Sequence, residues 1–243
     1  MRVFGLIGYP LTHSFSAAYF KQKFETEGIR DAEYKLFPLT DIAQLPALLE
    51  KETHLIGLNV TIPYKEKVIP YLQVLDKVVE QIGASNCIHI RNGVMYGFNT
   101  DVIGCRQTLE AHIMPHHHRA LILGTGGAAK AVAYTLSALN IDYSFVSSQH
   151  NTLALSYASL DHAVMKSHQI IINTTPLGMF PEVDVKPAIP YRFLTEEHLL
   201  FDLIYNPAET AFMQAGKAQG ATVVNGLTML HVQAEESWKI WNT

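Results

Sequence analysis

The stretch Ala120-Leu-Ile-Leu-Gly-Thr-Gly-Gly-Ala-Ala-Lys130 decides the fold of the second half of this chain. A short apolar run is followed by Gly124, Gly126 and Ala129 in the spacing G-x-G-x-x-A, and residues 131–139 are good helix formers. Strand, glycine turn and helix in this order are typical of a dinucleotide-binding loop, because the glycine backbone and the helix N-terminus can both face a pyrophosphate. A purely structural glycine turn is the alternative.

Short apolar runs continue beyond this loop, at residues 143–146, 170–172 and 199–204, and longer helix-compatible segments separate them. Nearly uninterrupted apolar runs indicate strands buried on both faces, as in a parallel sheet covered by helices on both sides. Residues 120 to about 228 are therefore predicted to form a doubly wound, Rossmann-type α/β domain.

The first hundred residues also mix strands and helices, which favours two α/β domains over one. Residues 3–7 and 55–60 are typical of strands, and a helix is predicted from Phe15 to about Glu27. We assign residues 1–103 (plus 229–243) to one domain and residues 104–228 to the other. The last segment has apolar residues at helical spacing, which predicts a final helix that returns to pack on the first domain.

Composition excludes several classes of protein. Hydrophobic residues make up 48% and charged residues 16% of the 243 residues, so a packed globule is expected. The formal net charge of −4 comes without a block of like charges, which argues against nucleic-acid binding and against a polybasic membrane anchor. The first apolar run is too short for a signal peptide, and no stretch approaches the roughly 20 apolar residues of a membrane helix.

The cysteines and histidines give no metal or disulfide pattern. Cys87 and Cys105 lie far apart without a C-x-x-C partner, so a reducing cytoplasm is the expected location. His112 and residues 116–118 suggest a metal site, but we interpret them as a solvated segment between the domains, and we predict no metal.

Polar clusters lie where the apolar runs of the first domain end, at residues 8–16, 59–65, 83–86 and 97–101. Asn59 and Thr61 alternate along an extended segment and therefore share one face. Each cluster also has a plain structural interpretation: a serine can cap a helix, Lys65 can be a solvated surface lysine, and Asp101 can begin the next helix.

Taken together, these clusters resemble the motifs of the shikimate dehydrogenase family, and the resemblance covers essentially the whole chain. The first domain carries G-x-P-x-x-H-S-x-S at residues 8–16, N-V-T-x-P-x-K at 59–65, G-A-x-N at 83–86 and G-x-N-T-D at 97–101. The second carries N-x-T-P-x-G-M at 173–179, D-x-x-Y-x-P-x-x-T at 202–210 and G-x-x-M-L-x-x-Q at 226–233. Seven motifs in the right order make coincidence implausible.

The resemblance implies an NADP-dependent oxidoreductase of chorismate and aromatic amino acid biosynthesis, acting as a monomer or homodimer. It would reversibly reduce 3-dehydroshikimate to shikimate, with Lys65 and Asp101 as the pair that exchanges a proton with the substrate hydroxyl. The groups that would hold the substrate are Ser14, Ser16, Asn59, Thr61, Asn86, Tyr205 and Gln233. The groups that would hold the cofactor are Gly124, Gly126, Gly127, Ala128, Ala129, Ser147, Ser148, Asn173, Thr174, Thr175, Met179, Leu203, Gly226 and Met229.

One departure concerns the cofactor. Ser147-Ser148-Gln149 stands where family members that prefer NADP usually show Asn-Arg-Thr. No carboxylate is present for the ribose 2′-hydroxyl of NAD, which favours NADP, but no arginine is present for a 2′-phosphate either. NAD use, as in a quinate/shikimate dehydrogenase, therefore stays an alternative, although Ser16 favours shikimate because quinate-using relatives often carry threonine there. A catalytically silent dinucleotide-binding paralogue is the other alternative, against which the presence of Lys65 and Asp101 argues.

Overall fold

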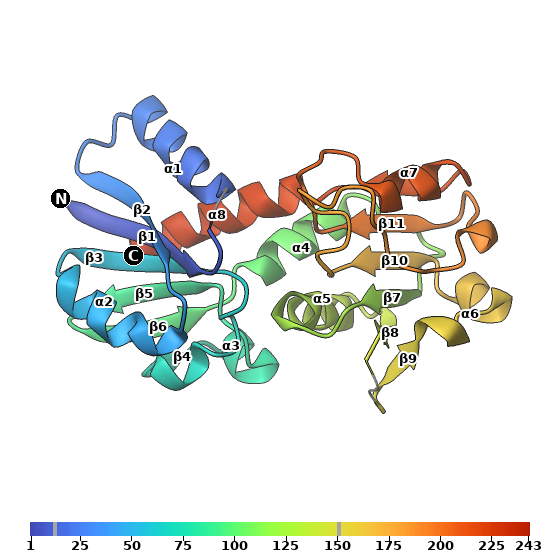
Figure 1. Cartoon of the computed structure of the whole chain (residues 1–243), viewed down its shortest axis with the longest axis horizontal. Helices are drawn as coiled ribbons and strands as arrows, with labels where there is room; N and C mark the ends of the chain where they lie inside the picture. The colour runs from blue at the N-terminus through green and yellow to red at the C-terminus, as the bar shows by residue number, and fades with distance from the viewer. Residues whose placement is uncertain (12–13, 150–151) are drawn as a thin grey trace. The chain divides into compact units, whose positions relative to one another are not determined.

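The computed structural model describes residues 1–11, 14–149 and 152–243, which form two compact units (Figure 1). Unit 1 contains Met1–Thr100 and Ala234–Thr243, and unit 2 contains Asp101–Gln233. Both units are built of strands and helices, which confirms the predicted α/β fold class.

The sheet of unit 1 has six strands in the order β2-β1-β3-β5-β6-β4. Their bounds are β1 Arg2–Gly8, β2 Ala32–Pro38, β3 Leu55–Val60, β4 Val74–Leu75, β5 Cys87–Arg91 and β6 Val94–Phe98. β1 runs parallel to β2 and β3, whereas β5 is antiparallel to both β3 and β6. The carboxyl ends of β1, β3 and β6 and the amino end of β5 therefore lie at the same end of the sheet.

The helices of unit 1 are α1 (Phe15–Thr26), α2 (Leu45–Lys51), α3 (Lys77–Ile82) and the second half of α8 (Leu227–Trp241), with 3₁₀ turns η1 (Ile42–Gln44) and η2 (Ile69–Tyr71). Trp241 of α8 is buried, stacks on Phe4 with 5.0 Å between ring centroids, and donates from its indole nitrogen to the Ile88 carbonyl at 2.9 Å. Gly57 lies beneath this indole, and a side chain there would clash with it. The prediction that the last helix packs on the first domain is confirmed.

The sheet of unit 2 is entirely parallel, in the order β12-β11-β10-β7-β8-β9. Its strands are β7 Arg119–Leu123, β8 Asp142–Ser147, β9 Ala154–Ser156, β10 Ile170–Asn173, β11 Leu199–Asp202 and β12 Thr222–Val224. The chain moves outward from β7 to β9, then returns to β10 on the other side of β7. This reversal is the topological switch point at which doubly wound sheets bind ligands, and the predicted Rossmann-type fold is confirmed.

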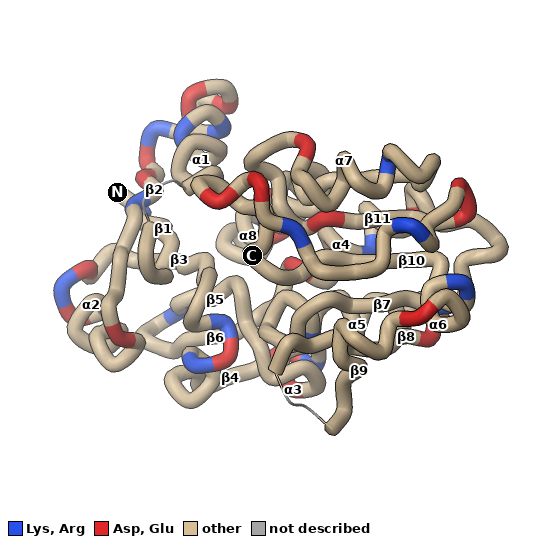
Figure 2. Tube along the Cα trace, turned by 45° about the vertical axis from the view of Figure 1, so that its right-hand side comes forward, with Lys and Arg blue, Asp and Glu red and all other residues tan. Residues whose placement is uncertain are grey.

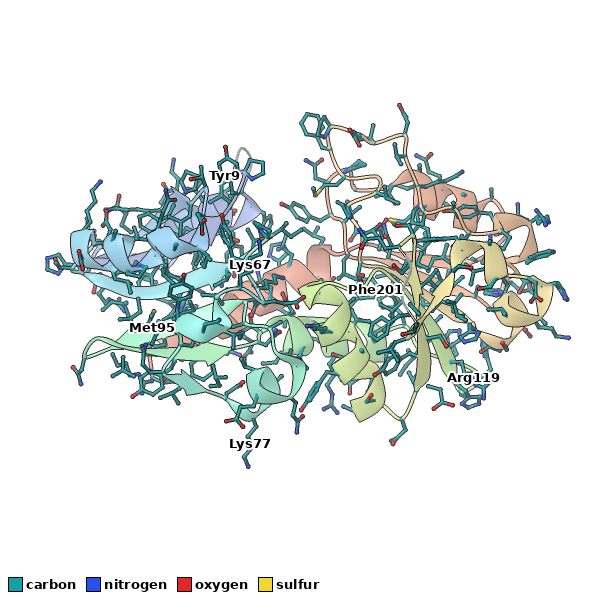
Figure 3. All side chains as sticks on the ribbon, turned by 60° about the horizontal axis from the view of Figure 1, so that its bottom comes forward. Tyr9, Lys67, Lys77, Met95, Arg119 and Phe201 are labelled. Carbon is teal, nitrogen blue, oxygen red and sulfur yellow. The ribbon has the colours of Figure 1, made fainter. Side chains whose placement is uncertain are left out.

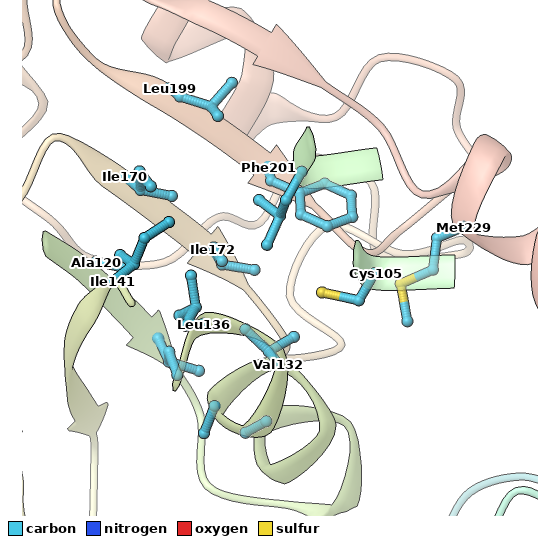
Figure 4. Close-up of a cluster of buried hydrophobic side chains, with 14 residues drawn as sticks. Cys105, Ala120, Val132, Leu136, Ile141, Ile170, Ile172, Leu199, Phe201 and Met229 are labelled. Carbon is cyan, nitrogen blue, oxygen red and sulfur yellow. The ribbon is translucent and has the colours of Figure 1, made fainter. Parts of the chain in front are cut away.

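Alternate side chains of each unit 2 strand fill different cores, which explains the uninterrupted apolar runs. Ile122, Ile172 and Phe201 face α5 (Gly127–Ala138) in one cluster (Figures 3 and 4). Leu121 and Ile171 lie in a second cluster on the opposite face. The other helices are α4 (Asp101–Glu110), α6 (His162–Ser167), α7 (Ala211–Lys217) and the first half of α8, with 3₁₀ turns η3 (Tyr157–Ser159) and η4 (Tyr191–Phe193).

The histidine segment before β7 differs from the sequence-based interpretation. His116 and His118 are exposed, but His117 is buried, so describing the segment as solvated was wrong for this residue. Its Nδ1 accepts from the Met114 amide at 2.9 Å and its Nε2 bonds the Glu197 carbonyl at 3.1 Å. The ring closes a turn. Its two nitrogens bond to backbone groups, whereas the polar sequence suggested that they bond to water.

Candidate functional site

The polar clusters of unit 1 meet at one end of its sheet. Ser14 and Ser16 follow β1, Thr61 and Lys65 follow β3, Asn86 immediately precedes β5, and Thr100 follows β6. Because of the strand directions described above, all of these positions lie at the same end. Asp101 is joined directly to Thr100 and is the first residue of α4.

The two serines of the first motif have different surroundings. Ser14 is the N-cap of α1, and its hydroxyl accepts from the Ala17 amide at 3.3 Å. The structural interpretation as a cap is therefore correct for Ser14, although the hydroxyl proton is still available for donation. Ser16 lies inside the helix and is buried. Thr12 and His13 of the same motif lie outside the described residues.

Asn59 and Asn86 are both buried and held by specific hydrogen bonds. The Tyr34 hydroxyl donates to Asn59 Oδ1 at 2.8 Å, and Asn59 Nδ2 donates to Ser237 Oγ at 2.9 Å. Asn86 Oδ1 accepts from the Thr100 amide at 2.7 Å, and Asn86 Nδ2 donates to Thr100 Oγ1 at 3.0 Å. Sequence reasoning missed Tyr34, Thr100 and Ser237. For Ser237 a signal existed, since it lies one helical turn after Gln233.

The loop that carries Lys65 is anchored at this residue and at the one before it. The Lys65 carbonyl accepts from the Ser85 amide at 2.8 Å, and the buried Tyr64 donates its hydroxyl to the Leu39 carbonyl at 2.6 Å. Lys65 is partly buried, whereas Lys67 is exposed (Figure 3). Asp101 is 5% exposed, and an aspartate side chain is rarely this buried unless it is paired.

The glycine loop of unit 2 has the backbone that an anion site requires. Gly124 has φ +110°, and a Cβ on it would lie 2.7 Å from Thr174 Oγ1. Gly126 is the N-cap of α5, and apart from its chain neighbours no described heavy atom lies within 4 Å of where its Cβ would be. The first turn of α5, which begins with Gly127 and Ala128, carries no acidic residue. Open space over uncapped, partly positive amides fits a pyrophosphate.

The loops that follow β7, β10 and β11 are bonded to one another. The Thr174 amide and hydroxyl both donate to the Leu123 carbonyl, at 3.0 and 2.6 Å. Asn173 Oδ1 accepts from the Thr175 hydroxyl at 2.6 Å, and Asn173 Nδ2 donates to Asp202 at 3.1 Å. The Leu203 amide donates to the Asn173 carbonyl at 3.0 Å, which brings these predicted cofactor residues together.

Asp202 is a further polar residue to which the sequence assigned no role. Its fully buried carboxylate also accepts from the Thr210 hydroxyl at 2.6 Å and the Ile204 amide at 3.1 Å. Burial raises the pKa of Asp202 to about 6, and the hydrogen bond from Thr210 opposes that shift. A carboxylate at the end of a buried strand was the available signal.

The remaining predicted residues are placed as follows. Met179 is 44% exposed, whereas Met229 is buried against Gly104. Tyr205 is partly buried, Gly226 is buried beside Leu203, and the buried Gln233 donates to the Leu230 carbonyl at 3.0 Å.

The segment after β8 that is predicted to distinguish NADP from NAD is largely exposed. Ser147 Oγ accepts from the Gln149 amide at 3.1 Å, and Ser148 and Gln149 are exposed. His150 and Asn151, the next residues, lie outside the described part of the chain.

Charges of both signs are interspersed along each unit (Figure 2).

The described residues lack two further kinds of feature. They contain no group of three or more His, Cys, Asp or Glu side chains that could hold a metal ion. None of the helices in the described ranges is long and apolar enough to cross a bilayer.

Comparisons with known proteins identify the family. Residues 6–88 match the model of the shikimate dehydrogenase substrate binding domain. A shikimate dehydrogenase (NADP(+)) of Methanococcus maripaludis is 36% identical, with 99% of this chain and 91% of that protein covered. The Thermus thermophilus shikimate 5-dehydrogenase, solved with NADP(H) and shikimate, has a TM-score of 0.87 at 28% identity, covering 99% of this chain and 93% of that one. A Listeria monocytogenes shikimate 5-dehydrogenase, solved with shikimate and NAD, has a TM-score of 0.83 at 26% identity, covering 100% and 92%.

Proposed function

Because the chain belongs to the shikimate dehydrogenase family, we propose that it performs the family reaction with Lys65 and Asp101 as its catalytic pair. The protein is an NADP-dependent shikimate dehydrogenase of the pathway to chorismate and the aromatic amino acids. It reversibly reduces 3-dehydroshikimate to shikimate.

The observation that carries the residue assignment is the gathering of neutral polar groups at one end of the unit 1 sheet. A polyhydroxylated ring is recognised by such groups, since each one rejects an analogue that leaves it unpaired. Ser14, Ser16, Thr61 and Asn86 have the hydroxyl and amide groups for this task. Tyr205 and Gln233 of unit 2 complete the proposed substrate set.

Lys65 and Asp101 supply the acid–base chemistry in this proposal. NADPH, when bound, supplies the hydride that adds to the carbonyl carbon of 3-dehydroshikimate. The carbonyl oxygen then gains a proton, which the pair donates, and in the reverse direction the pair accepts the hydroxyl proton.

The dinucleotide is held by unit 2 in this proposal. The residues present fit it, because the amides of Gly126, Gly127 and Ala128 at the start of α5 suit the pyrophosphate. Residues 173–179, Leu203, Gly226 and Met229 would hold the nicotinamide end, and Ser147 and Ser148 would hold the adenosine end. Residues 1–103 with 229–243 form the substrate domain, and residues 104–228 form the cofactor domain.

Location and assembly are also proposed. Cys87 and Cys105 are buried free thiols, which suits a reducing cytoplasm. We assign a monomer or homodimer.

The test is a two-by-two comparison of purified protein, with kcat/KM measured for shikimate and quinate using NADP⁺ and NAD⁺. The expected result is that shikimate with NADP⁺ gives the highest value. Preference for quinate with NAD⁺ would assign the quinate/shikimate type instead, and turnover with no pair would identify a silent paralogue.

A further inference from the structure

A continuous hydrogen-bonded chain of side chains runs through unit 1, and it ends at a proposed substrate residue. We call it the Tyr34–Asn86 network, and its members in order are Tyr34, Asn59, Ser237, Thr100 and Asn86. The Ser237 and Thr100 hydroxyl oxygens lie 3.3 Å apart. Asn86, at its end, is one of the residues proposed to touch shikimate.

The carboxamide of Asn59, in the middle, has no proton left for a ligand. An asparagine side chain has two N–H protons and one carbonyl oxygen. One proton goes to Ser237 Oγ at 2.9 Å and the other to the Asn86 carbonyl at 3.4 Å, while Oδ1 accepts from Tyr34. Asn59 is 4% exposed. It therefore holds its neighbours and does not donate to substrate.

The two partners that orient Asn59 are themselves fixed by packing. Ser237 is fully buried on α8. The Tyr34 ring stacks on Phe20 with 4.6 Å between centroids, and burial raises the pKa of the Tyr34 hydroxyl, so this group stays a neutral donor.

We propose that Tyr34 and Ser237 are positioning residues for substrate recognition: they fix Asn59 and, through it and Thr100, the direction in which Asn86 presents its polar groups. This inference rests on the proposed function, since that function gives Asn86 its contact with shikimate. Loss of either hydroxyl leaves one end of the buried Asn59 carboxamide without its hydrogen-bond partner. The carboxamide then rotates to form another hydrogen bond. The affinity for shikimate should therefore fall. The affinity for the dinucleotide should not change, because the residues proposed to hold it lie in unit 2.

The test compares Tyr34→Phe and Ser237→Ala, singly and together, with wild type and with Tyr191→Phe. Tyr191 is a matched control, because its partly buried hydroxyl donates to the Pro187 carbonyl at 2.8 Å in unit 2, and it belongs to neither proposed residue set. For each protein, kcat, KM for shikimate, KM for NADP⁺ and Tm are measured, together with the shikimate Kd by calorimetry.

Each network variant is expected to raise KM and Kd for shikimate by about three- to tenfold, because one hydrogen bond is lost. Its KM for NADP⁺ should stay within about twofold of the wild-type value. Tyr191→Phe should leave both constants unchanged. The double variant should be less impaired than the product of the single effects, because both hydroxyls act through Asn59.

A lower Tm with an unchanged shikimate Kd, or an equal rise in both KM values, would show a merely structural role and overturn the inference. Absence of turnover in wild type would contradict the proposed function instead, and the inference is then judged on the shikimate Kd alone. Wild type that does not bind shikimate would overturn both.

Discussion

The Thr210 hydroxyl lies 2.6 Å from the Asp202 carboxylate, and both side chains are fully buried. The same carboxylate accepts from Asn173 and from the Ile204 amide, so it connects the loops after β10 and β11. A buried carboxylate that connects two loops makes their stability sensitive to pH.

Asp202 should make the protein less stable as pH rises from about 4 to 7. Its pKa is raised from 3.8 to about 6, so the folded state holds a proton that the unfolded state has lost. That stabilisation is complete below 3.8 and is lost as pH rises through about 6. In Asp202→Asn this loss is absent, so the Tm of the variant minus that of wild type should increase across this range. Parallel Tm curves in scanning fluorimetry would contradict the assignment.

His117 should act in the opposite direction. Burial lowers the pKa of His117 below its usual 6.5. Its contribution to stability is present above pH 6.5 and is lost as pH falls through the folded pKa, because a protonated Nδ1 cannot accept from the Met114 amide. His117→Gln should therefore lose less Tm between pH 7 and pH 5 than wild type does. His116→Gln, at an exposed neighbour, should behave as wild type, and equal slopes in all three proteins would argue against this role.

Lys65→Ala should lower kcat by about 10²- to 10⁴-fold, the usual contribution of a positioned acid or base. The KM for shikimate should change much less, since the proton is transferred only in the transition state. Lys67→Ala removes an exposed lysine from the same loop and should keep wild-type kcat (Figure 3). An unchanged kcat in Lys65→Ala would refute the catalytic role.

Gly126→Ala and Gly124→Ala should separate cofactor binding from folding. A Cβ at Gly126 enters open space, so Tm should hold, while crowding of the pyrophosphate should raise the Kd for NADP⁺ at least about fivefold. A Cβ at Gly124 meets Thr174 at 2.7 Å with φ at +110°, so Tm itself should fall. If Gly126→Ala binds NADP⁺ as wild type does, the pyrophosphate lies elsewhere.

Ser148→Arg should increase the preference for NADP⁺ over NAD⁺. A guanidinium matches the 2′-phosphate, which NAD⁺ lacks. The ratio of the two kcat/KM values should rise about tenfold at low salt and fall as ionic strength increases. Ser148→Gln is the neutral control, and an equal change for both cofactors in Ser148→Arg would indicate that residue 148 does not approach the phosphate.

The sequence by itself determined the fold class, the all-parallel second sheet and the return of the last helix. Local rules suffice for these features: apolar runs such as residues 170–172 mark doubly buried strands, and the glycine spacing at 124–129 marks a turn into a helix. The same motifs also indicated the family.

Only the tertiary structure decided which polar groups are partners. Tyr34, Asn59 and Ser237 come from three distant segments, and hydrogen bonds between them depend on strand order and helix packing, which no local pattern encodes. The same reason explains His117, whose polar sequence surroundings predicted solvent. It also explains Asp202, whose hydrogen-bond partners come from the end of β10 and from the loop after its own strand β11. Burial and hydrogen-bond partners are properties of the folded chain, so they appear only when distant residues have been brought together.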